Sequence, residues 1–373
     1  MIYLDYSATT PVDKRVLETF NKVCLNYPGN SNSLHKLGIE AHELEEYATN
    51  KIADILSLDN KEIIYTSGAS ESNNQAIKGV CFKYKNRGNH IITTYLEHSS
   101  VINTVNYLSD NGFEVDFVKL DDDGRVDLKH LKSLMTNDTI LVSICMVDSE
   151  LGIMQPISDV KRILKDYPKC LFHVDCTQAL GKIDIDFSMM DLASVSAHKI
   201  YGMKGSGLLI KNKDLNILSL IHGGKSTTIY RSGTPALPLI VSTMKAIELV
   251  YTDMDKNYSY VEDLKNMIIE KIKKYDKVHI NSTKYSIGYV LNLSILGVKP
   301  ETFVHSLDEK EIYISTKSAC SNTDTMSSSV YSVTKNRDFA MHSIRISLSY
   351  LTTKDEIFDF LIAFDECYKK YVY

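Results

Sequence analysis

The stretch that decides the fold runs from residue 171 to residue 205 and reads LFHVDCTQALGKIDIDFSMMDLASVSAHKIYGMKG. It contains two short apolar segments, 171–174 and 192–196. The first is followed by Asp175, and the second by His198 and Lys199. Apolar runs of this length predict buried strands of an α/β sheet. Because ligands bind outside the carboxyl ends of strands in such sheets, we expect Asp175 and Lys199 to meet at one site.

An acid and a lysine at neighbouring strand ends indicate a particular cofactor. Pyridoxal phosphate (PLP) needs an amine for a Schiff base and a carboxylate against its pyridinium nitrogen. Taken alone, the same pair is also compatible with a buried Asp175 and an unrelated surface Lys199. The rest of the chain has to decide between these interpretations.

Length and composition set broad limits. The chain has 373 residues, of which 44% are hydrophobic and 24% charged, as is typical of a globular protein with two domains. A net charge of −5 gives no reason to expect nucleic acid or a membrane as a partner. The N-terminus lacks a basic region followed by an apolar core, so we expect no secretory targeting and a cytoplasmic protein. Seven scattered cysteines, without zinc spacing, predict reduced thiols and no metal site.

Strand and helix patterns alternate through the first two thirds of the chain. Strands are predicted at 63–66, 90–94, 114–119 and 140–146, with helices at 75–84, 101–108, 128–135 and 158–166. This order predicts a mostly parallel sheet covered by helices. Beyond a long helix at 237–250, strands at 289–295, 312–316 and 344–348 with helices at 300–307 and 354–371 predict a smaller α+β domain. The polar stretch 321–332 is expected to be mobile.

A turn rich in Gly and Ser, residues 67–74, follows the strand at 63–66 and opens a helix. Backbone N–H groups at a helix N-terminus form an anion site, which suits a phosphate group. The same residues are also compatible with an ordinary N-cap, in which the Ser70 side chain accepts from the helix start. The stretch leaves both interpretations open.

Several motifs together resemble one family. They are YLDYSATTP (3–11), YTSGASESNNQAIKG (65–79), EHSSV (97–101), ELG (150–152), HVDCTQALGK (173–182), SAHKIYGMKG (196–205), RSGTP (231–235), KSAC (317–320) and SIRISL (343–348). In order and spacing, the chain resembles the cysteine desulfurases of the NifS/IscS group, in the class V aminotransferase branch of PLP-dependent enzymes. The resemblance implies the α/β fold type I of PLP-dependent transferases, like aspartate aminotransferase, with a mostly parallel seven-stranded sheet in the larger domain. It also implies a homodimer, a large domain at 12–250, and a small domain made of 1–11 and 251–373.

The resemblance also implies roles for individual residues. Lys199 would form the Schiff base, Asp175 would face the ring nitrogen, and His98 would stack on the ring and serve as an acid or base. Further cofactor contacts would come from Ala69, Ser70, Ser149, Gln178, Ser196 and His198, with Thr234 reaching the partner subunit's phosphate. The substrate, L-cysteine, would be bound by Arg345 through its carboxylate and lined by Asn32 and Ala8.

Cys320 would be the nucleophile of this chemistry. As a thiolate it would take the sulfur of L-cysteine as a persulfide, release alanine, and pass the sulfur to an acceptor protein. That acceptor would be a scaffold for iron–sulfur cluster assembly or a tRNA-thiolation enzyme. The alternative for Cys320 is a buried, inert thiol, against which its polar neighbours Lys317 and Ser318 argue. The other six cysteines are interpreted as structural.

The chain departs from the family pattern beside the predicted site. Asp148 and Ser149 stand where the family has two asparagines, and the run at 223–227 is altered. Ser149 is too short to reach a cofactor ring without a water. These differences leave two other hypotheses open. One is a related PLP-dependent lyase or transaminase, such as a selenocysteine lyase or a cysteine/cystine β-lyase; the other is a weakly active protein of the same fold that acts as a binding partner.

Overall fold

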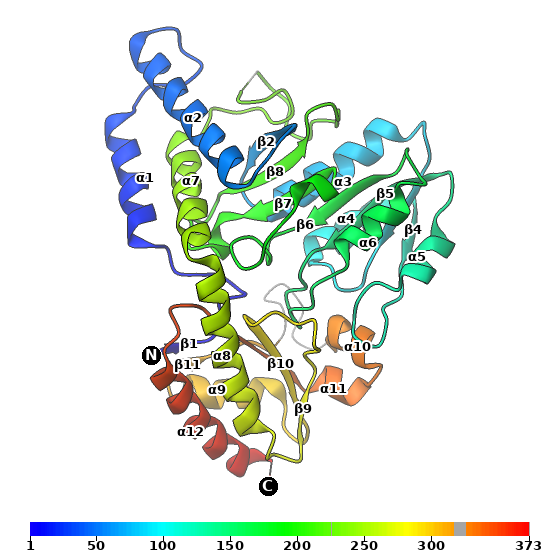
Figure 1. Cartoon of the computed structure of the whole chain (residues 1–373), viewed down its shortest axis with the longest axis vertical. Helices are drawn as coiled ribbons and strands as arrows, with labels where there is room; N and C mark the ends of the chain where they lie inside the picture. The colour runs from blue at the N-terminus through cyan, green and yellow to red at the C-terminus, as the bar shows by residue number, and fades with distance from the viewer. Residues whose placement is uncertain (225, 317–325, 373) are drawn as a thin grey trace.

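The structure is a computed structural model and describes residues 1–224, 226–316 and 326–372. Its larger part is built on a seven-stranded sheet of the described residues, with strand order β2-β8-β7-β6-β5-β3-β4 (Figure 1). The strands are β2 (Lys61–Thr66), β3 (His90–Thr93), β4 (Glu114–Phe117), β5 (Thr139–Cys145), β6 (Leu171–Asp175), β7 (Leu192–Ser196) and β8 (Gly207–Asn212). All run in one direction except β8, which is antiparallel to both of its neighbours. The predicted α/β class and the mostly parallel sheet are therefore confirmed.

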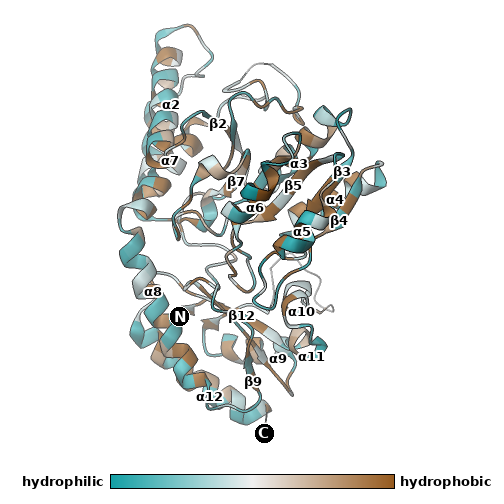
Figure 2. Ribbon diagram, turned by 45° about the vertical axis from the view of Figure 1, so that its right-hand side comes forward, coloured by the Kyte–Doolittle hydropathy of each residue, from teal (hydrophilic) through white to brown (hydrophobic). Residues whose placement is uncertain are grey.

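The central strands are apolar on both sides because helices cover both faces of the sheet. On β5, Leu141 belongs to a core cluster that includes Ile77 of α3 and Val105 of α4. The next residue, Val142, points into the other cluster, which contains Val160 of α6 and Ile247 of α7. The helices that belong to this part are α1 (Lys14–Asn26), α2 (Lys36–Ile55), α3 (Ala69–Tyr84), α4 (Ser99–Asp110), α5 (Leu128–Leu134), α6 (Ile157–Leu164) and α7 (Leu237–Thr252). In Figure 2 the hydrophobic colour gathers on the strands of this sheet, while the outer surfaces of α2, α5 and α6 are hydrophilic.

The smaller part contains a three-stranded antiparallel sheet of order β12-β10-β9. Its strands are β9 (Val278–Ile280), β10 (Val290–Ile295) and β12 (Ser343–Ser347), and its helices are α8 (Met254–Ile272), α9 (Pro300–Asp308), α10 (Ser328–Thr334), α11 (Arg337–Met341) and α12 (Lys354–Tyr371). The N-terminal strand β1 (Ile2–Tyr3) pairs with β11 (Ile312–Tyr313), so the first residues of the chain lie against this C-terminal part (Figure 1). That pairing supports grouping 1–11 with 251–373, and the domain boundaries themselves stay a prediction.

One local prediction was wrong. Within the stretch 321–332, expected to be mobile, residues from Ser328 onward form helix α10. The Ser327 side chain caps this helix by accepting from the backbone N–H of Val330, and Ser329 is buried. A serine that accepts from a helix N-terminus stabilises the helix instead of marking a loop. Residues 321–325 lie outside the described residues.

Within the described ranges, no helix is both long enough and apolar enough to span a membrane.

Candidate active site

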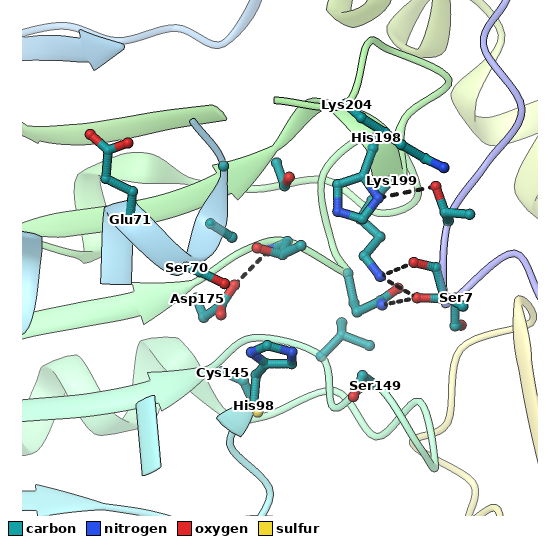
Figure 3. Close-up of a pocket in the computed structure, with 18 of the residues that line it drawn as sticks. Ser7, Ser70, Glu71, His98, Cys145, Ser149, Asp175, His198, Lys199 and Lys204 are labelled. Atoms are coloured by element: carbon teal, nitrogen blue, oxygen red, sulfur yellow. Dashed lines mark hydrogen bonds between the residues drawn. The ribbon is translucent and has the colours of Figure 1, made fainter. Parts of the chain in front are cut away.

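A cavity of about 510 Å³ lies at the carboxyl ends of β2, β5, β6 and β7. It forms there because parallel strands bring the residues that follow them to one edge of the sheet. Of the residues predicted for the site, the structure brings together around this cavity Ala8, Ala69, Ser70, His98, Ser149, Asp175, Gln178, Ser196, His198, Lys199 and Arg345. Figure 3 labels six of them: Ser70, His98, Ser149, Asp175, His198 and Lys199. The chain therefore assembles most of the predicted constellation from segments that are far apart in sequence.

Asp175 ends strand β6 and is almost fully buried. Its Oδ2 accepts from Asn73 Nδ2 at 2.8 Å, and its Oδ1 accepts from the backbone N–H of Thr177 at 2.9 Å. Because each oxygen accepts a hydrogen bond from a different group, the carboxylate has a fixed orientation beside the cavity. It can face a protonated ring nitrogen without rotating.

Lys199 lies in a short 3₁₀ turn, Ala197–Lys199, directly after β7. Its Nζ donates to the backbone carbonyls of Ser7 and Ala8, the second at 2.7 Å. The N-terminal arm thus lies against the amine. Figure 3 shows the Lys199 amine and the Asp175 carboxylate on different sides of the cavity, with the His98 imidazole below the space between them.

His98 precedes helix α4 and caps it with its ring. The Nδ1 atom accepts from the backbone N–H of Ser100 at 3.1 Å, which leaves the rest of the imidazole facing the cavity. Burial lowers the pKa of His98, and the nearby Asp175 carboxylate only partly opposes that effect. His98 is therefore a neutral imidazole at neutral pH.

The end of the cavity beside α3 suits an anion. Helix α3 begins at Ala69 after Gly68, whose φ is +144°, and no side chain caps this helix start. Ser70 is therefore not the N-cap, and the helix N-terminus with its favourable dipole borders the cavity. The Ser196 and Lys204 side chains line the same region. Burial, together with Lys199 and Lys204, lowers the pKa of His198 to about 4, so this ring is a neutral hydrogen-bonding group.

Arg345 reaches the cavity from strand β12 of the smaller part. Its Nη1 donates to the backbone carbonyl of Ser149 at 3.0 Å, and its Nη2 donates to Asp5 Oδ1 at 2.7 Å. Within the part of the chain that the structure describes, the buried Nε has no hydrogen-bond partner. A guanidinium that is held from two sides and still has unused N–H groups suits a carboxylate ligand.

Comparison with known proteins places this geometry in a family. The model of the aminotransferase class-V family matches residues 2–360. The chain belongs to that family. It is 40% identical over 369 residues to the cysteine desulfurase IscS of Buchnera aphidicola subsp. Acyrthosiphon pisum, covering 95% of this chain and 90% of that protein. The predicted kinship with the NifS/IscS group is confirmed.

Solved structures agree with the fold. The chain superposes on a NifS-like protein with a TM-score of 0.93 and 35% identity, over 99% of both chains. It superposes on SspA in complex with cysteine with a TM-score of 0.82 and 31% identity, over 95% of this chain and 100% of SspA. The fold is that of the PLP-dependent NifS-like proteins.

The residues of the cavity fit PLP, on which class-V aminotransferases depend. A carboxylate held by two donors, an amine at the neighbouring strand end and an uncapped helix N-terminus occupy three sides of one space. These groups match the ring nitrogen, the aldehyde carbon and the phosphate. Asp175 would keep the ring nitrogen protonated, Lys199 would hold the cofactor covalently, and the start of α3 with Ser70 and Ser196 would bind the phosphate.

Three of the residues predicted for the site do not line the main cavity in the structure. Asn32 is exposed in the loop before α2 and does not line it. Thr234 lines a smaller hollow of about 220 Å³, which shares Ser67 and Gly205 with the main cavity. Cys320 lies outside the described residues. The roles of all three stay predictions.

The structure adds residues that the sequence reasoning missed. Cys145, interpreted as structural, lines the cavity, because it pairs in register with Asp175 on the next strand. Lys182 is buried and donates from Nζ to Gln178 Oε1 at 2.7 Å, which directs the Gln178 Nε2 toward the Ser7 carbonyl. Burial lowers the pKa of Lys182 to about 7, with Lys199 and Arg345 adding to the effect. The sequence offered one signal for this contact, because Lys182 follows Gln178 by four residues.

Proposed function

We propose that this protein is a PLP-dependent cysteine desulfurase that converts L-cysteine to L-alanine and transfers the sulfur to Cys320. The observation that carries the proposal is the convergence of Lys199, Asp175, His98 and Arg345 on one cavity. Bound PLP supplies an electron sink that lets bonds at the substrate's α- and β-carbons break. The family kinship to IscS proteins supports the same reaction.

Each residue has a defined task in this reaction. Arg345 binds the substrate carboxylate and so orients the amino acid in the cavity. Lys199 would hold PLP through its amine and would move the substrate's α-proton. His98 lines the cavity and would pack beside bound PLP. The cysteine Cβ–Sγ bond breaks, the sulfur bonds to the Cys320 thiolate as a persulfide, and Cβ gains a proton to give alanine.

We further propose that the protein acts in the cytoplasm as a homodimer. The sulfur would go to an acceptor protein, either a scaffold for iron–sulfur clusters or a tRNA-thiolation enzyme. The six cysteines of the described residues are all free thiols, which suits a reducing compartment. The acceptor would take the persulfide sulfur by a second thiolate attack, so it must itself present a reactive thiol or a comparable nucleophile.

The decisive experiment compares wild-type protein with Cys320→Ser. Wild type loaded with PLP, given L-cysteine and a thiol reductant, should release sulfide and alanine in equal amounts. Serine cannot hold a persulfide, so Cys320→Ser should keep the bound cofactor, still bind cysteine and stop turning over. Mass spectrometry of wild type treated with cysteine alone should find one added sulfur on the Cys320 peptide. Added sulfur on Cys145 or Cys176, or undiminished sulfide release from the variant, would overturn the mechanism.

A second experiment tests the lysine. We expect Lys199→Ala to lose the visible absorbance of covalently bound PLP, because the linkage needs this amine. Borohydride reduction of the wild type should then fix PLP on the Lys199 peptide. Lys204→Ala is the matched control, since Lys204 also lines the cavity but its loss should leave the linkage on Lys199. PLP trapped on any other lysine would show that the site is misassigned.

The alternative is a β-lyase, and one observation favours it. Ser149 lines the cavity at a position where the family has an asparagine, so the lining of the cavity departs from the family pattern there. A β-lyase acting on cysteine or cystine would give pyruvate and ammonia instead of alanine, and it would not need Cys320. The product assay above therefore separates the two functions directly.

A further inference from the structure

Two side chains behind the cavity connect Asp175 with His98. Asn73 in α3 donates from Nδ2 to Asp175 Oδ2 at 2.8 Å and to Ser100 Oγ at 2.9 Å. Ser100 Oγ in turn lies 2.9 Å from His98 Nδ1. We call this pair the Asn73–Ser100 bridge. It joins three elements, α3, α4 and β6, and Asn73 has no solvent exposure.

The direction of each hydrogen bond in the bridge follows from counting hydrogens. A carboxylate only accepts, so the Asn73 amide must turn its nitrogen toward Asp175. The two amide hydrogens then go to Asp175 and to Ser100. A hydroxyl oxygen can accept two hydrogen bonds, so the backbone decides the direction of the bond between Ser100 Oγ and His98 Nδ1. A backbone N–H aimed at Nδ1 makes that nitrogen an acceptor, and the Ser100 hydroxyl therefore donates its single hydrogen to it. The backbone N–H of Ser100 also points at that atom, from 3.1 Å.

His98 Nδ1 therefore faces two donors and cannot carry a hydrogen of its own without conflict. The neutral imidazole must have its proton on Nε2, the nitrogen away from the helix. Burial already opposes the charged form of His98, and its pKa is lowered. The imidazole consequently offers the cavity an N–H donor and no free lone pair.

The bridge has a structural cost that indicates a role. Asn73 Oδ1 is buried and has no hydrogen-bond partner among the described residues. An unsatisfied buried acceptor destabilises a fold, and such groups call for an explanation beyond packing. The gain here is that one amide fixes both the carboxylate and the imidazole of the site.

We propose that Asn73 and Ser100 are positioning residues, which orient Asp175 and hold His98 as the neutral Nε2–H tautomer that donates to the cavity. Only the expected effect on kcat for L-cysteine rests on the proposed function. It assigns His98 the part of a hydrogen-bond donor toward the substrate and cofactor in the resting enzyme.

The first test reads the tautomer without turnover. In ¹⁵N-histidine-labelled protein free of cofactor, two-bond ¹H–¹⁵N correlations at neutral pH report which ring nitrogen carries the proton, and His98→Gln assigns the signals. We expect the Nε2–H pattern for wild type. In Ser100→Ala, which loses one of the two donors, we expect a second, Nδ1–H species to appear. An Nδ1–H or doubly protonated ring in wild type, or an unchanged pattern in Ser100→Ala, would overturn the proposal.

The second test reads the effect on catalysis. Asn73→Ala should lower kcat for L-cysteine by about tenfold or more while KM changes by less than about threefold, because Arg345 still binds the substrate carboxylate. Ser100→Thr, which keeps the hydroxyl, should recover most of the activity lost in Ser100→Ala. Ser99→Ala is the matched control outside the bridge, and thermal unfolding of each variant shows that it is folded. Equal kcat in Asn73→Ala and wild type would refute the bridge; an inactive wild type with the Nε2–H pattern would instead refute the proposed function alone.

Discussion

At the scale of single residues, the site contains buried polar side chains, and some of their atoms have no hydrogen-bond partner among the described residues. Glu97, next to His98 in sequence, is an example. Its Oε1 accepts from Thr94 Oγ1 at 2.8 Å and from the backbone N–H of Cys145 at 2.9 Å, while its Oε2 is buried and finds no partner in residues 1–224, 226–316 and 326–372. Burial, together with the Asp175 carboxylate, raises the pKa of Glu97 to about 8. The side chain is thus a neutral acid at neutral pH that holds the end of β5 against β3.

This raised pKa makes stability depend on pH in a stated direction. Between the unfolded pKa, about 4.3, and the folded pKa, the folded state binds more protons, so wild type loses stability as pH rises. Glu97→Gln cannot ionise and removes that loss. The difference in free energy of unfolding between Glu97→Gln and wild type should therefore change in favour of the variant, by up to about 1.4 kcal/mol per pH unit between pH 5 and pH 8. Urea unfolding of both proteins across this range measures it, and parallel curves would contradict the assignment.

At the scale of elements, the anion end of the cavity depends on how closely β8 approaches the start of α3. Gly207 opens β8 and pairs with both Thr66 of β2 and Ser196 of β7. A Cβ at position 207 would lie 2.6 Å from the Gly68 Cα and 2.7 Å from the Val195 carbonyl oxygen. Both contacts are with backbone, which cannot move aside as a side chain can. The loop that presents the helix N-terminus therefore requires glycine at position 207.

We expect Gly207→Ala to lower the free energy of unfolding by about 1–3 kcal/mol and to weaken PLP binding, because the added methyl displaces the 67–70 turn. Gly224→Ala is the control, since a Cβ there would meet no atom of the described residues within 4 Å. Chemical denaturation and PLP titration measure the two effects. If Gly207→Ala bound PLP as tightly as the Gly224→Ala control, the close approach of β8 would not be what shapes the phosphate end.

At the scale of the whole molecule, one chain leaves parts of the expected site at its surface. Thr234 lines a hollow beside the main cavity, and Asn32 is exposed. Large apolar side chains are also exposed in the same two regions of sequence, with Leu34 95% and Ile229 69% accessible. These features support the proposed homodimer, in which each subunit completes the other's site.

A mixing experiment tests the shared site. Lys199→Ala and Thr234→Ala homodimers should each be impaired, and mixed dimers should regain activity, because one of their two sites has an intact Lys199 from one subunit and an intact Thr234 from the other. Activity of the refolded mixture against each parent measures this. Activity no higher than the average of the parents, or an active monomer on size-exclusion chromatography, would argue against a shared site.

The sequence by itself was enough to predict the large sheet and the core of the site. Apolar runs that end on Asp175 and Lys199 specify buried strands, and parallel strands bring their carboxyl ends to one edge for geometric reasons. The turn after β2 could also be recognised, although its two interpretations could be separated only by the structure, in which Gly68 and not Ser70 precedes the helix.

Only the tertiary structure decided how distant segments meet. Arg345 and Asp5 form an ion pair although 340 positions separate them, and the carbonyls of Ser7 and Ala8 accept from Lys199. No local pattern encodes such contacts, because they depend on how β1 pairs with β11 and how the smaller part packs on the sheet. The Asn73–Ser100 bridge has the same origin. In the sequence both residues are ordinary polar positions of a helix, and only the packing of α3, α4 and β6 places them between Asp175 and His98.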